Sequence, residues 1–314
     1  MADDKRRRRT RRRQMMRLPT VRLRHHGDLV ALIDGDVLVS TAVGPRGQLL
    51  TLWSDEPGRE ALTSYEIQQP TTVIARVVEF WPAPALTVSF AELRLAFPTV
   101  QPLPDDRTLI VGARTGGVEH NAAVYDGSGE LVMTGPLGDG IEYVRTTAAG
   151  DIWVGYFDEG VYGNDPLGGY GLVRFSKELE PSWRYTAPGG IGPIDDCYAL
   201  NVTDHEVWTC YYNSFPVVRI QDGHATGWNS GRPAHALIAY GDSIALVRGY
   251  GVEHDWGAVG TLAGDRLVIE REFRLTLPDG SELPEEARIF GHGSELHAIT
   301  DTAWLKVGLG DLHA

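Results

Sequence analysis

Hydrophobic and polar residues alternate with a period of two along most of this chain, in short runs separated by Gly, Asp, Asn and Pro. Such runs are typical of half-buried β-strands, and the residues between them favour turns. The clearest example is the run 142–146, followed by the turn 148–150 and a second run at 151–156. The same order of four strands is predicted in four stretches: 97–138, 139–190, 194–230 and 235–277.

The strand pattern recurs about every 40 to 55 residues, which is the length of one four-stranded propeller blade. Further units are expected at 29–53 and 288–307, and the second lacks its outermost strand. A strand near 20–24 would supply it and close the ring, which removes exposed sheet edges. We therefore predict an all-β fold, a single β-propeller of about six four-stranded blades over residues 20–314, with five or seven blades still open. The stretch 69–96 fits this pattern worst.

The chain is acidic overall, with a formal net charge of -13, but its charge is unevenly distributed. Residues 1–24 contain eleven Lys or Arg against Asp3 and Asp4, so the remainder carries -22. We expect residues 1–19 to be a disordered, Arg-rich arm. Such an arm suits nucleic acid, an anionic lipid surface or an acidic partner; the alternatives are a solvated tail and an arm folded against the acidic body. Because a net-acidic domain repels phosphate, nucleic acid would bind through the arm alone.

No run of the sequence approaches the length of a membrane span, and residues 14–27 lack the apolar core of a secretory signal. We therefore predict a cytoplasmic protein, in agreement with a chain that has only two cysteines, Cys197 and Cys210. These cysteines fall on neighbouring predicted strands. We expect buried thiols rather than a disulfide or a redox pair.

The two ends of the predicted propeller differ in the length of their loops. Links between the second and third strands of a blade, and between one blade and the next, emerge at one end and are long and polar. The turns at the other end are tight, as at 148–150. Because binding sites commonly form where a rigid scaffold presents long loops, we predict a ligand site at the first end, the long-loop face. The residues expected to bind the ligand are Arg114, Asn121, Asp139, Glu142, Tyr156, Asp158, Glu159, Asp195, Asp196, Tyr212, Asn213 and His254.

The acidic residues of this face come from successive blades, so their carboxylates could converge over the central channel. Converging carboxylates bind a hard cation, act as acid and base, or face cationic ligand groups; otherwise they are exposed or paired with Arg. If a metal binds, the expected ligands are Glu142, Asp196 and Asn201, and the cofactor would be Ca²⁺ or Mg²⁺. His120 and His235 would then be candidate catalytic residues that move a proton beside the metal.

One segment carries a resemblance to known propellers. Residues 150–155 read Gly-Asp-Ile-Trp-Val-Gly, which resembles the Gly-x-Ile-Trp-Val-Gly repeat of two-component-regulator and lyase-type propellers. Residues 97–104, 121–126 and 196–201 look like segments of propeller proteins from actinobacteria. The resemblance covers roughly residues 97–230, and it implies a fold rather than an activity. Lactonase and virginiamycin-lyase-type propellers, which hold a divalent metal, match this chain only in part.

Two functions are therefore expected. The first is a cytoplasmic recognition scaffold that binds a small molecule or a protein on the long-loop face. The alternative is a divalent-metal-assisted hydrolase or lyase, lactonase-like, with its site at the mouth of the central channel. The sequence leaves open whether the protein is an enzyme.

Overall fold

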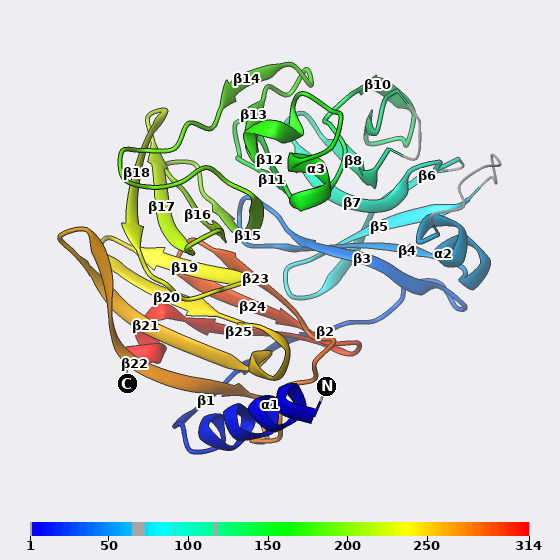
Figure 1. Cartoon of the computed structure of the whole chain (residues 1–314). Helices are drawn as coiled ribbons and strands as arrows, with labels where there is room; N and C mark the ends of the chain where they lie inside the picture. Colours follow the sequence, from blue (N-terminus) through cyan, green and yellow to red (C-terminus); the bar gives the residue numbers. More distant parts are fainter. Residues whose placement is uncertain (1, 65–72, 91, 116–118, 314) are drawn as a thin grey trace.

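A computed structural model describes residues 2–64, 73–90, 92–115 and 119–313 of the chain. The fold is all-β with a propeller arrangement, as the period-two pattern predicted (Figure 1). Within the described ranges, no helix has both the length and the apolar composition needed to cross a membrane.

Three sheets are each built from four consecutive antiparallel strands. This regular order follows from the tight Gly- and Asp-containing turns that the sequence places between strands. The stretch 69–96, whose sequence fits the blade pattern worst, supplies two strands, β5 and β6, to the first of these sheets. The strands of the three sheets are β3 (Val37–Val43), β4 (Leu49–Ser54), β5 (Ala75–Phe80) and β6 (Pro84–Phe90); β7 (Ala96–Leu103), β8 (Arg107–Arg114), β9 (Ala122–Tyr125) and β10 (Leu131–Gly135); and β11 (Ile141–Thr146), β12 (Ile152–Tyr156), β13 (Leu172–Phe175) and β14 (Pro181–Arg184).

A fourth four-stranded sheet joins the two ends of the chain. Its outermost strand comes from the N-terminal region and pairs antiparallel with β25, in the order β2-β25-β24-β23. The sequence placed this closing strand near 20–24, but Thr20–Arg22 (β1) instead pairs in parallel with β22. The strands of this sheet are β2 (Arg24–Asp28), β23 (Arg288–His292), β24 (Glu295–Ile299) and β25 (Ala303–Gly308).

The remaining strands form one nine-stranded sheet, where the sequence predicted separate four-stranded blades. Two antiparallel runs, β15–β18 and β19–β22, are joined because β18 pairs in parallel with β22 through Asn229 and Arg266. The described structure therefore has four separate four-stranded sheets and one larger sheet, and the expectation of six separate blades needs this correction. The nine strands are β1 at the edge beside β22, and β15 (Asp196–Val202), β16 (Val207–Tyr212), β17 (Pro216–Gln221), β18 (His224–Asn229), β19 (Ala236–Tyr240), β20 (Ser243–Val247), β21 (Trp256–Ala263) and β22 (Arg266–Thr276).

The first strand of each four-stranded run lies nearest the centre of the propeller. These strands are β3, β7, β11, β15, β19 and β23; each packs against the next, and β23 packs against β3 (Figure 1). The order of packing places β11 and β23 on opposite sides of the centre.

Apolar side chains fill the space between neighbouring sheets. Val111 and Val124 of the second sheet, for example, belong to one buried cluster with Val144 and Val154 of the third. Each such side chain contributes about 1.5–3 kcal/mol when it is fully buried. Cys197 and Cys210 are also buried and free, as the sequence predicted.

Short helices lie in the links between strands. Asp55 caps the longest of these, since its Oδ1 accepts a hydrogen bond from Gly58 N (2.8 Å). These elements, with the C-terminal helix, are α2 (Glu56–Leu62), α3 (Asp158–Val161), η1 (Gly168–Tyr170), η2 (Gly251–Glu253) and α4 (Leu309–His313).

The N-terminal arm, for which the sequence predicted disorder over 1–19, contains a helix, α1 (Ala2–Met15), that lies near β1 and β22 (Figure 1). Its last turns contact the propeller. Met15 is fully buried, and Arg12 Nη1 donates to Asp255 Oδ1 (2.7 Å). Arg11 forms an ion pair with Glu253 of η2. The end of the arm thus lies against the acidic body, which is one of the alternatives that the charge distribution left open.

Candidate functional site

Five aromatic rings gather on the long-loop face, around Tyr198 of β15. The Tyr198 ring stacks on the His235 ring, with centroids 4.7 Å apart and an interplanar angle of 15°. It also stacks on Tyr212 (6.3 Å, 26°), and it meets the Tyr250 ring edge to face (5.8 Å, 88°). Phe215 lies against the same ring (5.8 Å). We call Tyr198, Tyr212, Phe215, His235 and Tyr250 the aromatic cluster.

Hydrogen bonds hold the aromatic cluster in place. Tyr143 of β11 donates its hydroxyl hydrogen to Tyr198 O (2.6 Å) and lies 3.1 Å from His235 O. The Tyr250 hydroxyl donates to the Tyr198 hydroxyl (2.6 Å). Because these contacts join β11, β15 and the links before β19 and β21, the rings have fixed positions although Tyr212 and Tyr250 are 46% and 47% exposed.

Two carboxylates, Glu142 and Asp196, lie beside the aromatic cluster. Asp196 precedes Tyr198 by two residues on β15 and pairs with Tyr212 of β16. Burial is the largest cause of the raised pKa values of Tyr198 and Tyr250, and the Asp196 charge is a further one, so Asp196 lies close to the cluster. The Glu142 side chain is accessible to water. Partial desolvation by the surrounding protein, followed by repulsion from the Asp196 charge, nevertheless raises its pKa to about 7. Burial, followed by repulsion from Asp158, raises the pKa of Asp196 to about 6.

Among the ion pairs of the described residues, none within 4.0 Å involves Glu142 or Asp196, but the Arg114 charge acts on Glu142 from a greater distance and opposes the rise of its pKa. The nearby His235 does not supply a positive charge at neutral pH, because burial and then the Arg248 charge lower its pKa. Its Nδ1 lies 2.9 Å from Arg248 O. The arrangement is thus two carboxylates that form no close ion pair with a described cation, with the Arg114 charge farther away, next to partly exposed aromatic rings.

Other predicted ligand-binding residues of this face pair with one another. Arg114 forms an ion pair with Glu159, and its guanidinium lies over the Phe157 ring, 4.1 Å from the centroid. Asp195 Oδ1 accepts a hydrogen bond from the exposed Tyr162 hydroxyl (2.6 Å). The remaining polar residues make local bonds within the loops: Asp139 accepts from Thr115 N, Asp158 accepts from Glu159 N, and Asn213 accepts from the Ser214 hydroxyl.

Four predicted site residues are buried, and each has a polar atom that bonds a group within the protein. Asn121 bonds three backbone groups, of Gly112, Leu137 and Gly138. Tyr156 is fully buried and donates to Leu137 O. His254 is buried, with Nε2 3.1 Å from Leu283 O. Asn201 has no exposed surface, and its amide bonds Leu237 O and both peptide groups of Gly293.

The predicted metal site does not form from these donors. Asn201 uses its amide on backbone groups, so only Glu142 and Asp196 of the three expected ligands remain. Among the described residues, no group of three His, Cys, Asp or Glu is placed to hold a metal ion. His120 is exposed and bonds Thr134 Oγ1 (2.9 Å) on β10, whereas His235 belongs to the aromatic cluster. The two candidate catalytic histidines are therefore not brought together.

Sequence reasoning missed three members of the site: Tyr198, Phe215 and Tyr250. The available signal for Tyr198 was its place two residues after Asp196 on one strand, which puts both side chains on one side of a sheet. Tyr250 begins a long loop and Phe215 follows a turn, and no sequence pattern shows that these loops meet at Tyr198.

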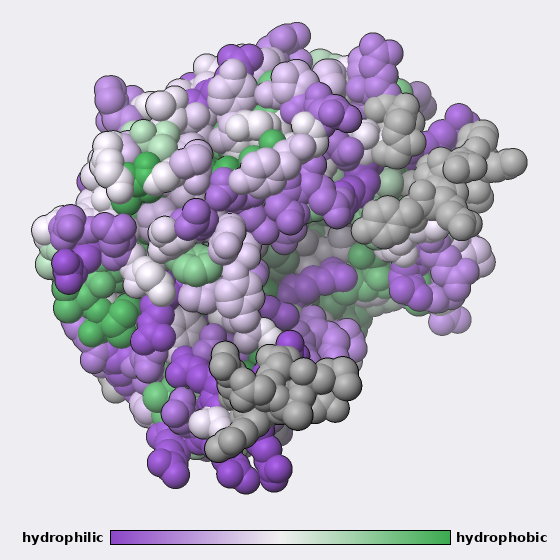
Figure 2. Space-filling model, in the orientation of Figure 1, coloured by the Kyte–Doolittle hydropathy of each residue, from purple (hydrophilic) through white to green (hydrophobic). Residues whose placement is uncertain are grey.

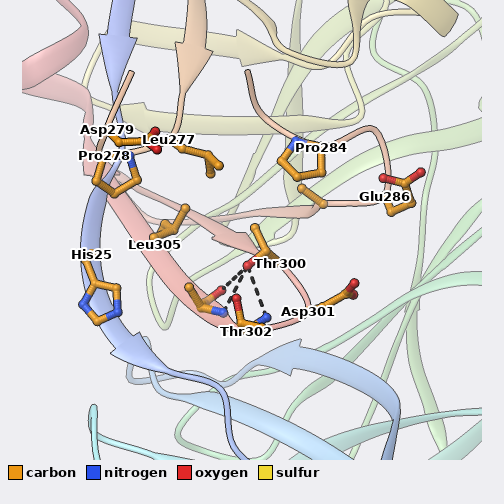
Figure 3. A pocket seen from close by; sticks show the side chains of 12 residues that line it. His25, Leu277, Pro278, Asp279, Pro284, Glu286, Thr300, Asp301, Thr302 and Leu305 are labelled. Carbon is orange, nitrogen blue, oxygen red and sulfur yellow. Dashed lines mark hydrogen bonds between the residues drawn. The ribbon is translucent and has the colours of Figure 1, made fainter. Parts of the chain in front are cut away.

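A separate cavity of about 510 Å³ lies between the link before β23 and the turn before β25 (Figure 3). Its polar groups mostly form turns: Asp279 Oδ1 accepts from Ser281 N (2.9 Å), and Thr300 Oγ1 accepts from Ala303 N (3.0 Å). It shares no lining residue with the aromatic cluster. We therefore place the candidate site at the aromatic cluster.

Comparison with known proteins gives little beyond the fold. The model of the YxzG family matches residues 186–230, which is a small part of the chain. No curated protein matches. The resemblance of 150–155 to the lyase-type repeat therefore stays a prediction.

Several solved structures have a similar arrangement. They include an inactive virginiamycin B lyase from Staphylococcus aureus with quinupristin (11% identity, TM-score 0.48, covering 89% of this chain and 98% of that one). Another is Kluyveromyces lactis Hsv2, with 11% identity and a TM-score of 0.49, covering 87% of this chain and 75% of that one. A third is a PQQ-bound aldose sugar dehydrogenase from Streptomyces coelicolor, with 12% identity and a TM-score of 0.46, covering 91% of this chain and 97% of that one. These likenesses are too weak to bear on activity or ligand, and the propeller arrangement rests on the strand pairing.

Proposed function

We propose that this propeller is a recognition scaffold that binds a small organic cation on its long-loop face. The observation that carries the proposal is the aromatic cluster beside Glu142 and Asp196, two carboxylates that form no ion pair with described residues. A cation over an aromatic face is attracted by the ring quadrupole, with about 0.5–2 kcal/mol per contact. The two carboxylates would add charge complementarity.

The geometry favours a small ligand over a protein partner. A protein-binding face would present a broad hydrophobic patch. In Figure 2 the hydrophobic side chains form separate patches within a largely hydrophilic surface. The exposed rings of the site, Tyr212 and Tyr250, both pack against Tyr198, so they offer a cation a small aromatic surface rather than an extended one.

The metal-assisted hydrolase or lyase is the weaker alternative, because the described donors do not form its ligand set. Glu142 and Asp196 retain raised pKa values that would suit proton transfer, but no nucleophile lies with them among the contacts of the cluster. A cytoplasmic location, and binding of nucleic acid or an acidic partner through the arm, remain proposals that rest on the sequence alone.

Choline and its neutral isostere 3,3-dimethyl-1-butanol are matched probes for the proposed site. We expect saturable binding of choline in isothermal titration calorimetry and at least tenfold weaker binding of the alcohol, because only the cation meets the rings and carboxylates favourably. Tyr250→Ala should weaken choline binding about 5- to 30-fold. Tyr250→Phe, which keeps the ring, should bind nearly as the wild type does.

Tyr240→Ala is the control, since Tyr240 is 77% exposed at the end of β19 beside the tight turn at Gly241. It should not change choline binding. Equal binding of choline and the alcohol, or an equal effect of the Tyr240 and Tyr250 variants, would contradict the proposal.

Binding of the cation should depend on pH through Glu142 and Asp196. Their pKa values of about 7 and about 6 mean that both carboxyls are largely protonated at pH 5 and ionised at pH 8. Because a cation prefers the ionised forms, the Kd for choline should fall as the pH rises through this window and level off above it. The double variant Glu142→Gln with Asp196→Asn should bind weakly and with a flat pH profile. Affinity that falls as the pH rises would count against this site.

A further inference from the structure

A buried arginine, Arg145, lies at the centre of the propeller. It belongs to β11, and only 6% of its surface is exposed. Its guanidinium lies 5.6 Å from the Tyr143 ring centroid on its own strand and 5.0 Å from that of Phe290. Phe290 is on β23, on the opposite side of the centre. The Arg145 side chain therefore reaches across the middle of the molecule.

Most of the hydrogen-bonding capacity of Arg145 is unused. Nη1 donates to Val144 O (3.1 Å), and Nε has no partner among the described residues. Nε is thus buried without a partner, and no described group bonds Nη2, which lies on the same edge of the guanidinium. Two parallel N–H groups on one edge are the arrangement that binds a carboxylate with two hydrogen bonds.

The charge of Arg145 also lacks a counterion. No described carboxylate forms an ion pair with it within 4.0 Å, and burial lowers its pKa to about 10. Even so, the group is positively charged at neutral pH. Burying an unpaired charge is costly, and natural proteins seldom keep one without a partner.

The neighbouring ionisable groups strengthen the positive potential at this point. His292, on β23, and His297, on β24, both have pKa values lowered by burial, with the Arg145 charge as a further cause. Lys306 contributes to the same lowering at both histidines. On the other side, Tyr143 is bonded to the backbone of Tyr198 and His235, so it separates Arg145 from the aromatic cluster.

We propose that Arg145 binds the carboxylate of a small molecule at the centre of the propeller, through its Nε and Nη2 edge. The site is distinct from the aromatic cluster, and its ligand would enter from the tight-turn end, because Arg145 is next to the last residue of β11 and β23 ends at His292. Phe290 and Tyr143 would flank the apolar part of such a ligand, because their rings already lie against the guanidinium.

Acetate and its neutral isostere acetamide test this proposal on the full-length protein by thermal unfolding at constant ionic strength. We expect acetate to raise the unfolding midpoint saturably, by about 5 °C at a hundredfold excess over its Kd, because a ligand of the folded state stabilises it. Acetamide should give less than a fifth of that shift. Chloride and inorganic phosphate, tested in parallel, should act more weakly than acetate.

Arg145→Met removes the charge but keeps a long apolar side chain, and it should abolish the acetate shift. It should also leave the midpoint without acetate unchanged or raised, since it removes an uncompensated buried charge. Arg174→Met is the control: Arg174 is on β13 and bonds Ser182 at the surface, so its variant should keep the full acetate shift.

If Arg145→Met does not fold, a crystal structure of the wild type grown with acetate is the alternative test. It should show acetate at the Nε and Nη2 edge of Arg145. Equal shifts with acetate and acetamide, an acetate shift that survives in Arg145→Met, or an empty edge in that crystal would overturn the proposal. A response to chloride or phosphate that exceeds the response to acetate would also overturn the carboxylate assignment.

Discussion

Replacing Asp255 by asparagine should lower the free energy of unfolding by about 3–5 kcal/mol, because it breaks a fully buried ion pair and leaves the buried Arg274 with only the exposed Glu282 as a carboxylate partner, at 3.3 Å. Asp255 has no exposed surface, and Arg274 is 4% exposed. Asp255 Oδ2 accepts from Arg274 Nε (2.8 Å) and lies 2.7 Å from Nη2. An asparagine would turn an amide NH₂ or a neutral oxygen toward these donors.

The same substitution should loosen the N-terminal arm. Asp255 Oδ1 accepts from Arg12 Nη1, and this is a contact between the end of α1 and the propeller. We expect faster hydrogen exchange in α1 of Asp255→Asn than in the wild type, in addition to the lower stability measured by urea unfolding.

Asp265→Asn is the matched control, because Asp265 is exposed and its contact with Arg266 is long, at 3.5 Å. Exposed pairs contribute about 0–1 kcal/mol, so this variant should unfold nearly as the wild type does. Similar losses for the two variants, or a loss below about 1 kcal/mol for Asp255→Asn, would show that the buried pair is not what stabilises this region.

Asn201→Ala should lower the free energy of unfolding by about 2–4 kcal/mol, the second largest effect that we expect. The Asn201 amide bonds Leu237 O (3.1 Å) and Gly293 O (2.8 Å), and it accepts from Gly293 N (2.8 Å). It thereby links β15 to β19 and to the turn after β23. Alanine would leave these buried backbone groups with fewer partners than they need.

In Asn201→Ala, Gly293 O keeps one further hydrogen bond, from Ala239 N (3.0 Å). The loss of stability therefore comes mainly from Gly293 N and Leu237 O, which lose their bonds to Asn201. Asn229→Ala is the control, since Asn229 is exposed and its side chain makes one long bond, of 3.4 Å, to Asp265 O. Equal urea midpoints for Asn201→Ala and Asn229→Ala would contradict the structural role. So would a variant of Asn201 that keeps wild-type stability but loses binding of a divalent cation.

Patterns within short segments were predicted well from the sequence. The alternation at 142–146 and 151–156 corresponds to β11 and β12, and the Gly- and Asp-containing turns lie between strands. Such local features depend on the propensities and hydrogen bonding of neighbouring residues, which are present in the sequence itself. The same reasoning placed both cysteines in buried positions on adjacent strands.

Features that depend on distant segments were predicted poorly. Asn121, Asn201 and His254 have the right chemistry for a site, but each is buried and bonded to backbone groups. A polar residue in a loop and a polar residue that fastens two loops look alike in a sequence. The difference is decided by burial, because a buried amide must satisfy its hydrogen bonds within the protein.

The amino-acid sequence was enough to predict short strands in repeated groups, an acidic body, a basic arm and one end rich in long loops. The folded chain was needed to show that β18 joins β22, that β2 rather than β1 closes the last sheet, and that Arg12 contacts Asp255. It also brought Tyr198, His235 and Tyr250 together, and it set Arg145 across the centre from β11 to β23. The reason is that these contacts join residues far apart in the chain, and their geometry depends on how all the sheets pack around one centre.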